Sequence, residues 1–396
     1  MIGEAWLVAF GLSGTLLFLA GVLHIPINAM TSVSVVVIAI GASIAIVRRP
    51  RLTRDSAIGA RAATVVTVIP IVVVLYAAAF IPVRDFDGRA FWLLKAKGIA
   101  HDHAIDGPFF HDQEVSDPRN DYPLLVPLNG AVVFLLGRTY DDAYVRWLHV
   151  LTFIAFVAFV RARLGVFPAA VLAWIPQFCV GAEGGALSAY NDIALAAFVA
   201  GAFYELMDAE RPWRFGMWLG FAVLTKNEGL PLALILLAAG ALVFRRRLLP
   251  ALVPLGVTVV ALFVWKHRIP HGGEEDLGAL LLTLPHQLHR LSEAITGLAT
   301  HLVAPPWGLF WCVVVVALVG LAWQGARREV VLSTLVISAS FLLYVAVYTV
   351  TTWVQLDLIN SSADRVLMHV VGPALYVIAA SGRVTLSERQ NAKALT

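Results

Sequence analysis

The sequence predicts an all-helical protein that crosses a membrane many times. Of its 396 residues, 59% are hydrophobic and only 14% are charged, and the mean hydropathy is +0.80. A soluble domain cannot cover so much apolar surface, so the composition indicates the membrane class. The apolar residues also form separate runs, many of them close to the roughly 20 residues that a helix needs to cross a bilayer.

The net charge and the cysteine positions further limit which class of membrane protein this can be. The net charge of +3 is too small to indicate a nucleic-acid partner. Cys179 and Cys312 lie inside apolar runs without a CxxC spacing, so we expect neither a disulfide nor a thiolate metal site. The N-terminus contains Glu4 and lacks a basic segment, and its apolar run is followed at once by another run. We therefore expect residues 5–23 to form a retained helix and not a signal peptide.

Twelve apolar runs are long enough, or nearly long enough, to be transmembrane helices. They are 5–23, 29–47, 62–82, 143–160, 167–182, 191–207, 214–226, 229–244, 249–265, 306–323, 330–350 and 366–381. A further run, 122–137, is shorter and contains Pro123, Pro127 and Gly130. No charge block or low-complexity stretch marks a separate soluble domain.

The distribution of lysine and arginine predicts which loops face the cytoplasm, because these residues are enriched in short cytoplasmic loops. The basic clusters fall at 48–54, 161–163, 211–214, 245–247, 327–328 and 383–393. With twelve spans and both termini inside, every cluster lies in the cytoplasm. If 122–137 also crossed, the later clusters would lie outside, so we expect this run to be re-entrant or to lie at the membrane surface.

The same topology places the polar segments on the non-cytoplasmic face. The two large outer loops are 83–121 and 266–305, and the smaller outer segments are 183–190, 226–229 and 351–365. Asp87, Asp192, Lys226 and Arg365 come from four distant parts of the chain, yet all fall in or beside these segments. We therefore expect them to meet in one cavity that opens away from the cytoplasm.

The first outer loop contains most of the candidate groups. Asp85 and Asp87 follow directly after the third run, where they are either solvated caps or functional carboxylates. Residues 89–100 have helical spacing and are expected to lie at the membrane surface, with Lys95 and Lys97 toward the headgroups. The histidines and aspartates of 101–112 could bind a divalent metal but match no recognised ligand motif.

Each later polar residue has a structural and a functional interpretation. Asp192 is a helix cap or a site carboxylate. Lys226 either pairs with Glu228 in the same turn or meets an anionic ligand. Arg365 either extends to the interface or binds a phosphate with its planar guanidinium.

Taken in order, these segments resemble the GT-C superfamily of membrane glycosyltransferases, which includes protein O-mannosyltransferases and aminoarabinose transferases. The resemblance covers residues 62–381 and depends on the order and spacing of short motifs. These are Trp92-x-x-Lys95-Ala96, Tyr122-Pro123-Leu124-Leu125, Tyr190-x-Asp192, Leu224-Thr225-Lys226-Asn227-Glu228-Gly229 and Ser361-Ser362-x-Asp364-Arg365. The chain departs from the family in three ways. Residues 1–61 add two spans, Asp85-Phe86-Asp87 replaces the frequent Asp-Glu pair, and only a short tail, 382–396, follows the last span.

The resemblance implies roles for the candidate residues. Asp87 looks like the catalytic aspartate, with Asp85 as the fallback, and Asp192 looks like the second acidic residue. Lys226 and Arg365 look like contacts to the lipid phosphate. The remaining substrate-binding candidates are Lys95, Lys97, Tyr122, Tyr190 and Glu228.

The implied activity is transfer of a sugar from a polyprenyl-phosphate donor to a hydroxyl of a lipid, glycan or protein acceptor. It would proceed with inversion at the outer face of a bacterial inner membrane, and a divalent metal could take part. The main alternative is a transporter or a lipid-linked-sugar flippase, although no paired halves are visible in the sequence. A non-catalytic assembly subunit and an acyltransferase using His149 are two further alternatives.

Overall fold

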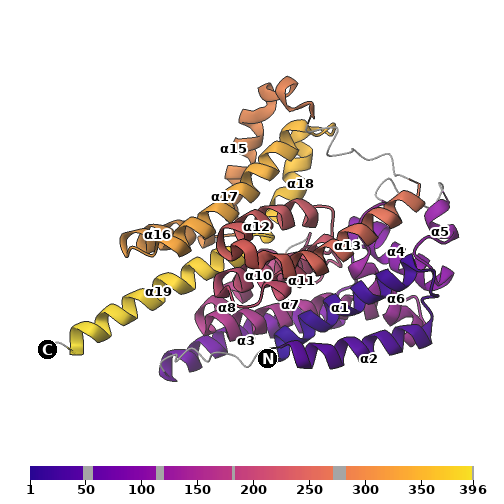
Figure 1. The fold of residues 1–396 in the computed structure, drawn as a ribbon, viewed down its shortest axis with the longest axis horizontal. Helices are drawn as coiled ribbons and strands as arrows, with labels where there is room; N and C mark the ends of the chain where they lie inside the picture. Colours follow the sequence, from indigo (N-terminus) through magenta and orange to yellow (C-terminus); the bar gives the residue numbers. More distant parts are fainter. Residues whose placement is uncertain (48–56, 113–119, 181–182, 271–281, 395–396) are drawn as a thin grey trace.

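The computed structural model describes residues 1–47, 57–112, 120–180, 183–270 and 282–394. Every regular element in these ranges is a helix, which confirms the predicted all-helical class. Figure 1 shows a bundle of long helices from which α15 (Leu291–Leu302) and α18 (Gln355–Met368) project. The basic cluster at 48–54 lies outside the described residues.

The other elements follow one another in chain order. In the first half they are α1 (Ile2–Val22), α2 (Ala29–Ile46), α3 (Ala57–Phe80), η1 (Gly88–Leu93), α4 (Leu94–Asp102), α5 (Pro108–His111), α6 (Leu125–Gly137), α7 (Asp142–Leu164), α8 (Val166–Trp174) and α9 (Pro176–Cys179). In the second half they are α10 (Asp192–Asp208), α11 (Pro212–Val223), α12 (Gly229–Phe244), η2 (Arg245–Leu248), α13 (Leu249–Arg268), η3 (Leu284–His286), η4 (Leu288–Arg290), α16 (Phe310–Trp323), α17 (Arg327–Val350) and α19 (Val371–Ala394).

Six helical segments of the described chain are long and apolar enough to cross a membrane. They are Ile2–Val22, Ala29–Ile46, Arg61–Phe80, Asp142–Leu164, Gly229–Arg268 and Arg327–Val350. The pair α18 and α19, which is bent by 47° at its break, could add a seventh. The protein is therefore a helical membrane protein, but the predicted number of twelve spans is not confirmed.

Short or broken helices account for part of this difference. Helix α10 has 17 residues, α11 has 12 and α16 has 14. The predicted span 167–182 is divided into α8 and α9, and α9 begins at Pro176. Proline removes a helix hydrogen bond and clashes with the preceding turn, so a break at this position is expected.

The segment Gly229–Arg268 turns back on itself. Arg245 has a left-handed backbone with a φ of 50° and ends α12. Near the other end of the segment, Lys266 Nζ lies 2.9 Å from Oδ1 of Asn227, which precedes α12. The start of α12 and the end of α13 therefore lie at the same end of the bundle, and the two helices are antiparallel.

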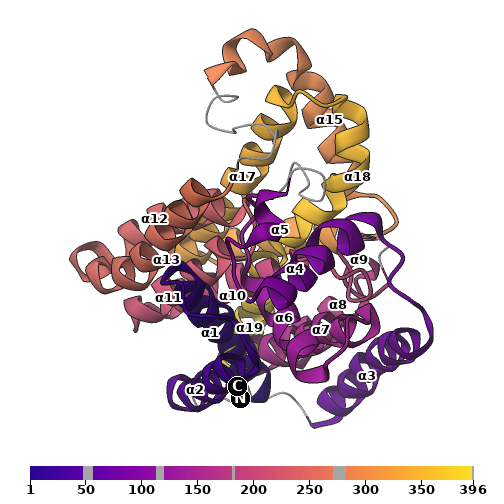
Figure 2. The same ribbon diagram turned by 90° about the vertical axis from the view of Figure 1, so that its right-hand side faces the viewer.

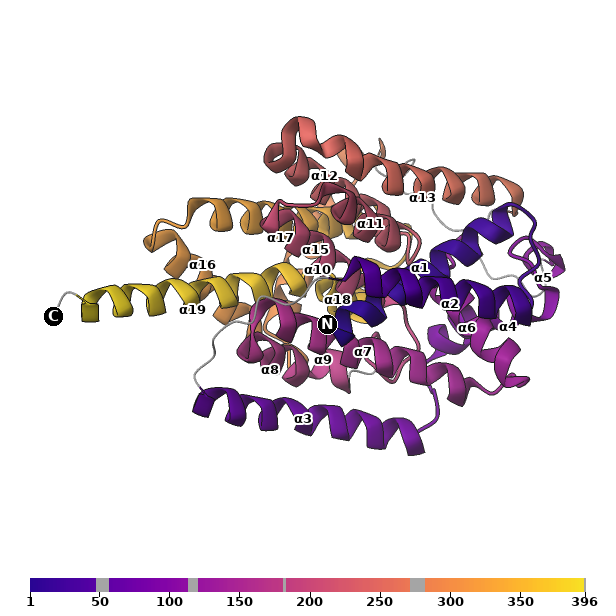
Figure 3. The ribbon, with the colours of Figure 1, turned by 60° about the horizontal axis from the view of Figure 1, so that its bottom comes forward.

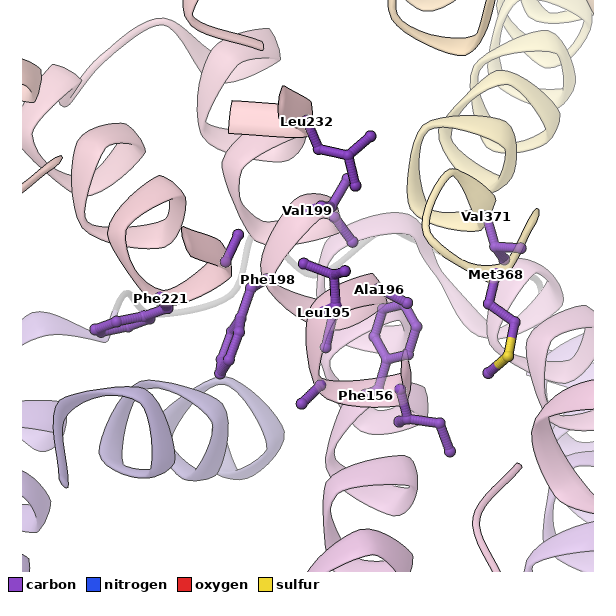
Figure 4. Packing of buried hydrophobic residues seen from close by; sticks show 14 of the residues in the cluster. Phe156, Leu195, Ala196, Phe198, Val199, Phe221, Leu232, Met368 and Val371 are labelled. Carbon is purple, nitrogen blue, oxygen red and sulfur yellow. The ribbon is translucent and has the colours of Figure 1, made fainter. Parts of the chain in front are cut away.

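Helix α10 forms the centre of the bundle. All of its residues except the last are buried, and Figure 4 shows Leu195, Phe198 and Val199 surrounded by side chains of neighbouring helices. In Figure 3 it lies between α3 on one side and α12 and α13 on the other. Because a helix rises about 1.5 Å per residue, the two ends of α10 are about 25 Å apart.

Different charged groups surround the two ends of α10. Asp192 is its first residue, whereas Glu205 lies in its last turn. Arg163 Nη2 lies 2.6 Å from Glu205 Oε1 and 2.9 Å from Glu4 Oε1, and Arg214 also pairs with both carboxylates. Two of the predicted cytoplasmic clusters, those of Arg163 and Arg214, thus lie at the end of α10 opposite to Asp192.

Helix α6 corresponds to the predicted run 122–137. It packs among α1, α4 and α7, and its 13 residues rise about 20 Å, less than the roughly 30 Å apolar core of a bilayer. The Asn129 side chain donates to the carbonyl of Phe10 in α1 at 3.2 Å. A re-entrant position of this helix stays a prediction.

The predicted surface position of residues 89–100 is wrong. Ile99 is fully buried, and Trp92 and Lys95 are 6% and 2% exposed. Small residues allow this close packing, because a Cβ placed on Gly130 of α6 would lie only 3.0 Å from the Cβ of Ala96 in α4. The segment is part of the protein interior and not a membrane anchor. Figure 2 shows α4 lying against α6.

Two exposed arginines at opposite ends of the bundle allow a direct test of which end faces the cytoplasm. Arg138 is exposed just before α7, whereas Arg246 is exposed at the end of the bundle that carries Arg163. In a chain lacking Cys179 and Cys312, we expect Arg138→Cys to react with a membrane-impermeant maleimide in intact cells. Arg246→Cys should react only after permeabilisation, and the reverse pattern would contradict the predicted orientation.

Candidate functional site

Asp192 is the centre of a buried ionic cluster. It begins α10, where a carboxylate is stabilised by the positive end of the helix dipole. Its side chain is fully buried, and Oδ1 lies 2.9 Å from Lys226 Nζ and 2.9 Å from His369 Nε2. These partners come from the turn before α12 and from the break between α18 and α19.

The cluster extends from Asp192 in two directions. Lys226 Nζ also lies 3.0 Å from Glu228 Oε1. His369 Nδ1 lies 2.8 Å from the hydroxyl of Tyr344 in α17. Among the described residues, Oδ2 of Asp192 and Oε2 of Glu228 are buried acceptors without a hydrogen-bond partner. Buried acceptors without partners are costly, so these two oxygens are suited to receive a ligand or water proton.

Asp87 and Arg365 form the second part of the site. Arg365 Nη1 lies 3.4 Å from Asp87 Oδ2, and its Nε lies 3.6 Å from Glu183 Oε2. The guanidinium also stacks over the ring of Tyr190, 4.8 Å from its centroid. Asp87 is a quarter exposed, with 26% of its side chain accessible, whereas Arg365 is mostly buried.

The two parts belong to one site because α18 connects them. Arg365 and His369 are four residues apart, so their side chains project from the same side of the helix. Arg365 thus reaches Asp87 while His369 reaches Asp192. Asp87 and Arg365 are 278 residues apart in the chain, so only the tertiary fold brings them together.

Two glycines permit this close assembly. A Cβ on Gly88 would lie 2.1 Å from the carbonyl oxygen of Ser188. Because Gly88 has no side chain, η1 can approach the segment before α10 this closely. Gly184 has a φ of +83°, and a Cβ on it would lie 2.9 Å from Cγ of Arg365. Glycine adopts this left-handed conformation without strain, which explains its position beside Glu183.

The acidic groups around Arg365 influence one another. Burial raises the pKa of Asp85 above its ordinary value, and the charge of Asp87 raises it further while Arg365 lowers it. Burial likewise raises the pKa of Glu183, against the lowering effect of Arg365. The pKa of Tyr190 is also raised by burial. Five carboxyl groups therefore share two permanent cations: Asp85, Asp87, Glu183, Asp192 and Glu228 against Lys226 and Arg365.

The other predicted site residues take different positions. Lys95 lies between two rings, with Nζ 5.5 Å from the centroid of Trp92 and 5.4 Å from that of Tyr122. Lys97 instead pairs with Asp142 at 2.7 Å. Lys97 is thus bound to the start of α7 and not to the ionic cluster.

Two features connect the Tyr122 region to the cluster. The amide of Leu125 donates to the carbonyl of Leu224, two residues before Lys226, at 2.8 Å. Lys266 lies 3.1 Å from Asp121 and 2.9 Å from Asn227. The Tyr-Pro-Leu-Leu segment and the Lys226 turn are therefore neighbours.

Sequence reasoning did not select Glu183, Tyr344 or His369 as site residues. His369 is a lone histidine beside an apolar helix, a pattern that usually indicates packing. Its spacing of four residues from Arg365 was the available signal. His149, by contrast, is buried and uses Nδ1 to bind the carbonyl of Tyr190 at 3.0 Å, which supports a packing role.

No group of three or more His, Cys, Asp or Glu side chains in the described ranges is arranged to hold a metal ion. In the first outer loop, Oδ2 of Asp102 accepts from the amide of Phe109 at 2.7 Å, and His103 contacts the carbonyl of Ile27. These side chains stabilise the loop. Cys179 is buried and Cys312 is exposed, and both are free thiols.

Fold and site together define a helical membrane protein with a buried ionic cluster at one end of its bundle. Comparison of the chain with protein-family models, with curated proteins and with solved structures gives no match. Any assignment of activity therefore depends on the geometry of the cluster.

Proposed function

We propose that this protein is a glycosyltransferase that moves a sugar from a polyprenyl-phosphate donor to an acceptor hydroxyl at the non-cytoplasmic membrane face. The observation that supports this proposal most directly is the contact of Asp87 Oδ2 with Arg365 Nη1 at 3.4 Å, next to the Asp192–Lys226 pair. A partly accessible carboxylate beside two cations offers a base for the hydroxyl and counter-charges for a departing phosphate.

In the proposed reaction, Asp87 accepts the proton of the acceptor hydroxyl while the hydroxyl oxygen attacks the anomeric carbon. The bond from that carbon to the phosphate oxygen breaks, and the electron pair leaves with the polyprenyl phosphate. Direct displacement inverts the configuration at the sugar. A carboxylate is a weak base toward a ground-state hydroxyl, but it suffices when the proton moves late in the reaction.

Arg365 and Lys226 stabilise the charge that develops on the phosphate. Arg365 is held over Tyr190 and between Asp87 and Glu183, so its guanidinium is already oriented. Oriented donors in a site with little water stabilise a developing anion strongly, by about 3 kcal/mol each. Asp192 and Glu228 hold Lys226 in position.

The excess of carboxylates over cations suggests that the donor phosphate enters the site together with a cation. Five carboxyl groups surround two permanent cations, so a bare phosphate would meet a net negative site. A divalent cation accompanying the donor phosphate would offset this surplus, and no ready-made metal cluster is needed for that role.

The proposal is tested with purified protein and a panel of polyprenyl-phosphate sugars, by thin-layer detection of sugar release. We expect turnover with at least one donor, faster in Mg²⁺ than in EDTA. The released lipid should be the polyprenyl phosphate, and the product sugar should have inverted configuration. Absence of turnover with the whole panel, by protein that remains folded, would contradict the proposal.

One observation favours the transporter or flippase alternative. Helix α18 and helix α19 are bent by 47° at a break that contains His369, which pairs with the buried Asp192. Broken helices with paired charges at the break are typical of transporters. Movement of an unchanged lipid-linked sugar across proteoliposomes, without sugar release, would favour this alternative.

A further inference from the structure

A basic groove lies at the end of the bundle opposite to the ionic cluster. It is formed where α12 ends, α17 begins and α10 ends, and has a volume of about 550 Å³. Its walls include Leu242, Val243, Arg245, Arg327, Arg328 and Val331; we refer to it as the arginine groove. Because α10 separates it from Asp192 by about 25 Å, the arginine groove is distinct from the candidate active site.

Among the described residues, the three arginines of this groove have no acidic partner. In the described chain, none of the three guanidinium groups forms an ion pair with a carboxylate, whereas Arg163 and Arg214 nearby each pair with Glu4 and Glu205. Arg328 donates to the carbonyls of Leu206 and Met207 at the end of α10. Arg245 and Arg327 are exposed. Three guanidinium groups in one groove form a site for a phosphate anion.

The apolar wall of the groove identifies the source of that phosphate. Leu242 and Val331 are 63% and 58% exposed, and they belong to segments long and apolar enough to cross the membrane. A free phosphate compound would leave these side chains uncovered. The acyl chains of a lipid would cover them while its headgroup meets the arginines, as in basic pockets between membrane helices.

We propose that the arginine groove binds the headgroup of an anionic phospholipid, with an acyl chain packed along Leu242 and Val331. Arg245 and Arg327 contact the phosphate directly. Arg328 connects the same headgroup to the end of α10, the helix whose other end carries Asp192. The proposal does not depend on the proposed transferase activity.

The test measures lipid binding to the full-length, delipidated protein by native mass spectrometry. The probes are phosphatidylglycerol, phosphatidylcholine with the same acyl chains, and glycerol phosphate as the soluble headgroup. We expect tighter binding of phosphatidylglycerol than of phosphatidylcholine, and little competition by glycerol phosphate. Because each arginine near an anionic headgroup contributes about a fivefold factor, Arg245→Gln with Arg327→Gln should weaken phosphatidylglycerol binding about 30-fold.

The matched control removes the same charge from the same end of the bundle. Arg211 and Arg246 are exposed and do not line the groove, so Arg211→Gln with Arg246→Gln should change binding less than about threefold. Equal weakening by both double variants would show a general charge effect and overturn the proposal. Full displacement of phosphatidylglycerol by glycerol phosphate would assign the groove to soluble phosphates and overturn it as well. Neither pair forms a side-chain ion pair within the described ranges, so both double variants should remain folded, and thermal melting is the check.

Discussion

Replacing Asp87 with Asn should lower the rate of sugar transfer about 1000-fold while the protein stays folded. A positioned general base typically contributes about 10² to 10⁴ in rate. Asparagine keeps the size of the side chain and can still accept a hydrogen bond from Arg365, but it cannot take the hydroxyl proton. The measurement is the transfer rate of detergent-purified protein, with thermal melting as the check on folding.

Two further variants make this result interpretable. Asp85→Asn removes the neighbouring carboxylate and should have a smaller effect; a larger effect than that of Asp87→Asn would move the base to Asp85. Asp357 is exposed in the first turn of α18, the helix that carries Arg365, so Asp357→Asn should leave the rate unchanged. A near-normal rate of the Asp87 variant would remove the basis of the mechanism.

Replacing Lys226 with Met should destabilise the protein by about 3 to 5 kcal/mol, because removing one partner leaves a buried charge uncompensated. Asp192 is fully buried and Lys226 is 7% exposed, so neither charge can be solvated in place. The double variant Asp192→Asn with Lys226→Met removes both charges and should recover part of the loss, while Glu228, the other partner of Lys226, stays uncompensated. Reversible unfolding in detergent, followed as a double-mutant cycle, measures the coupling.

The control for this cycle is a pair with similar geometry but more exposure. Lys97 lies 2.7 Å from Asp142, and 33% of its side chain is exposed. Because solvent screens such a pair, Lys97→Met should cost less than about 1 kcal/mol. Equal losses for Lys97→Met and Lys226→Met would show that burial does not make the Asp192–Lys226 pair more costly to break than an exposed pair.

The composition and the apolar runs predicted the class of fold correctly. Long runs such as those of α1, α2, α7 and α17 became helices with bounds within a few residues of the prediction. The number of spans was less predictable, since helix length depends on tertiary packing. Neighbouring helices cover nearly all of α10, so its 17 residues, the same number as in the predicted run 191–207, need not match the thickness of a bilayer. The same packing buries α4, whose helical spacing alone resembled that of a surface helix.

The candidate site was predictable only in part. Its acidic and basic members stood out because charges are rare in this chain, and the expected convergence agrees with the Asp87–Arg365 and Asp192–Lys226 contacts. Lys97 was selected because it was expected to share the headgroup face of a surface helix with Lys95. Residues two apart on a helix do not face the same way, and Lys97 pairs with Asp142 instead. His369 and Tyr344 were not selected because nothing local distinguishes them from packing residues.

The sequence by itself determined that this protein is helical and belongs in a membrane, because hydropathy and length are properties of local segments. It also determined which few charged residues must find partners, because an unpaired charge among apolar residues is costly wherever the chain places it. Only the tertiary structure decided which charges became partners. Pairing across 278 residues depends on how α18 packs against α10 and on glycines that allow the backbones to approach, neither of which can be read from a single segment.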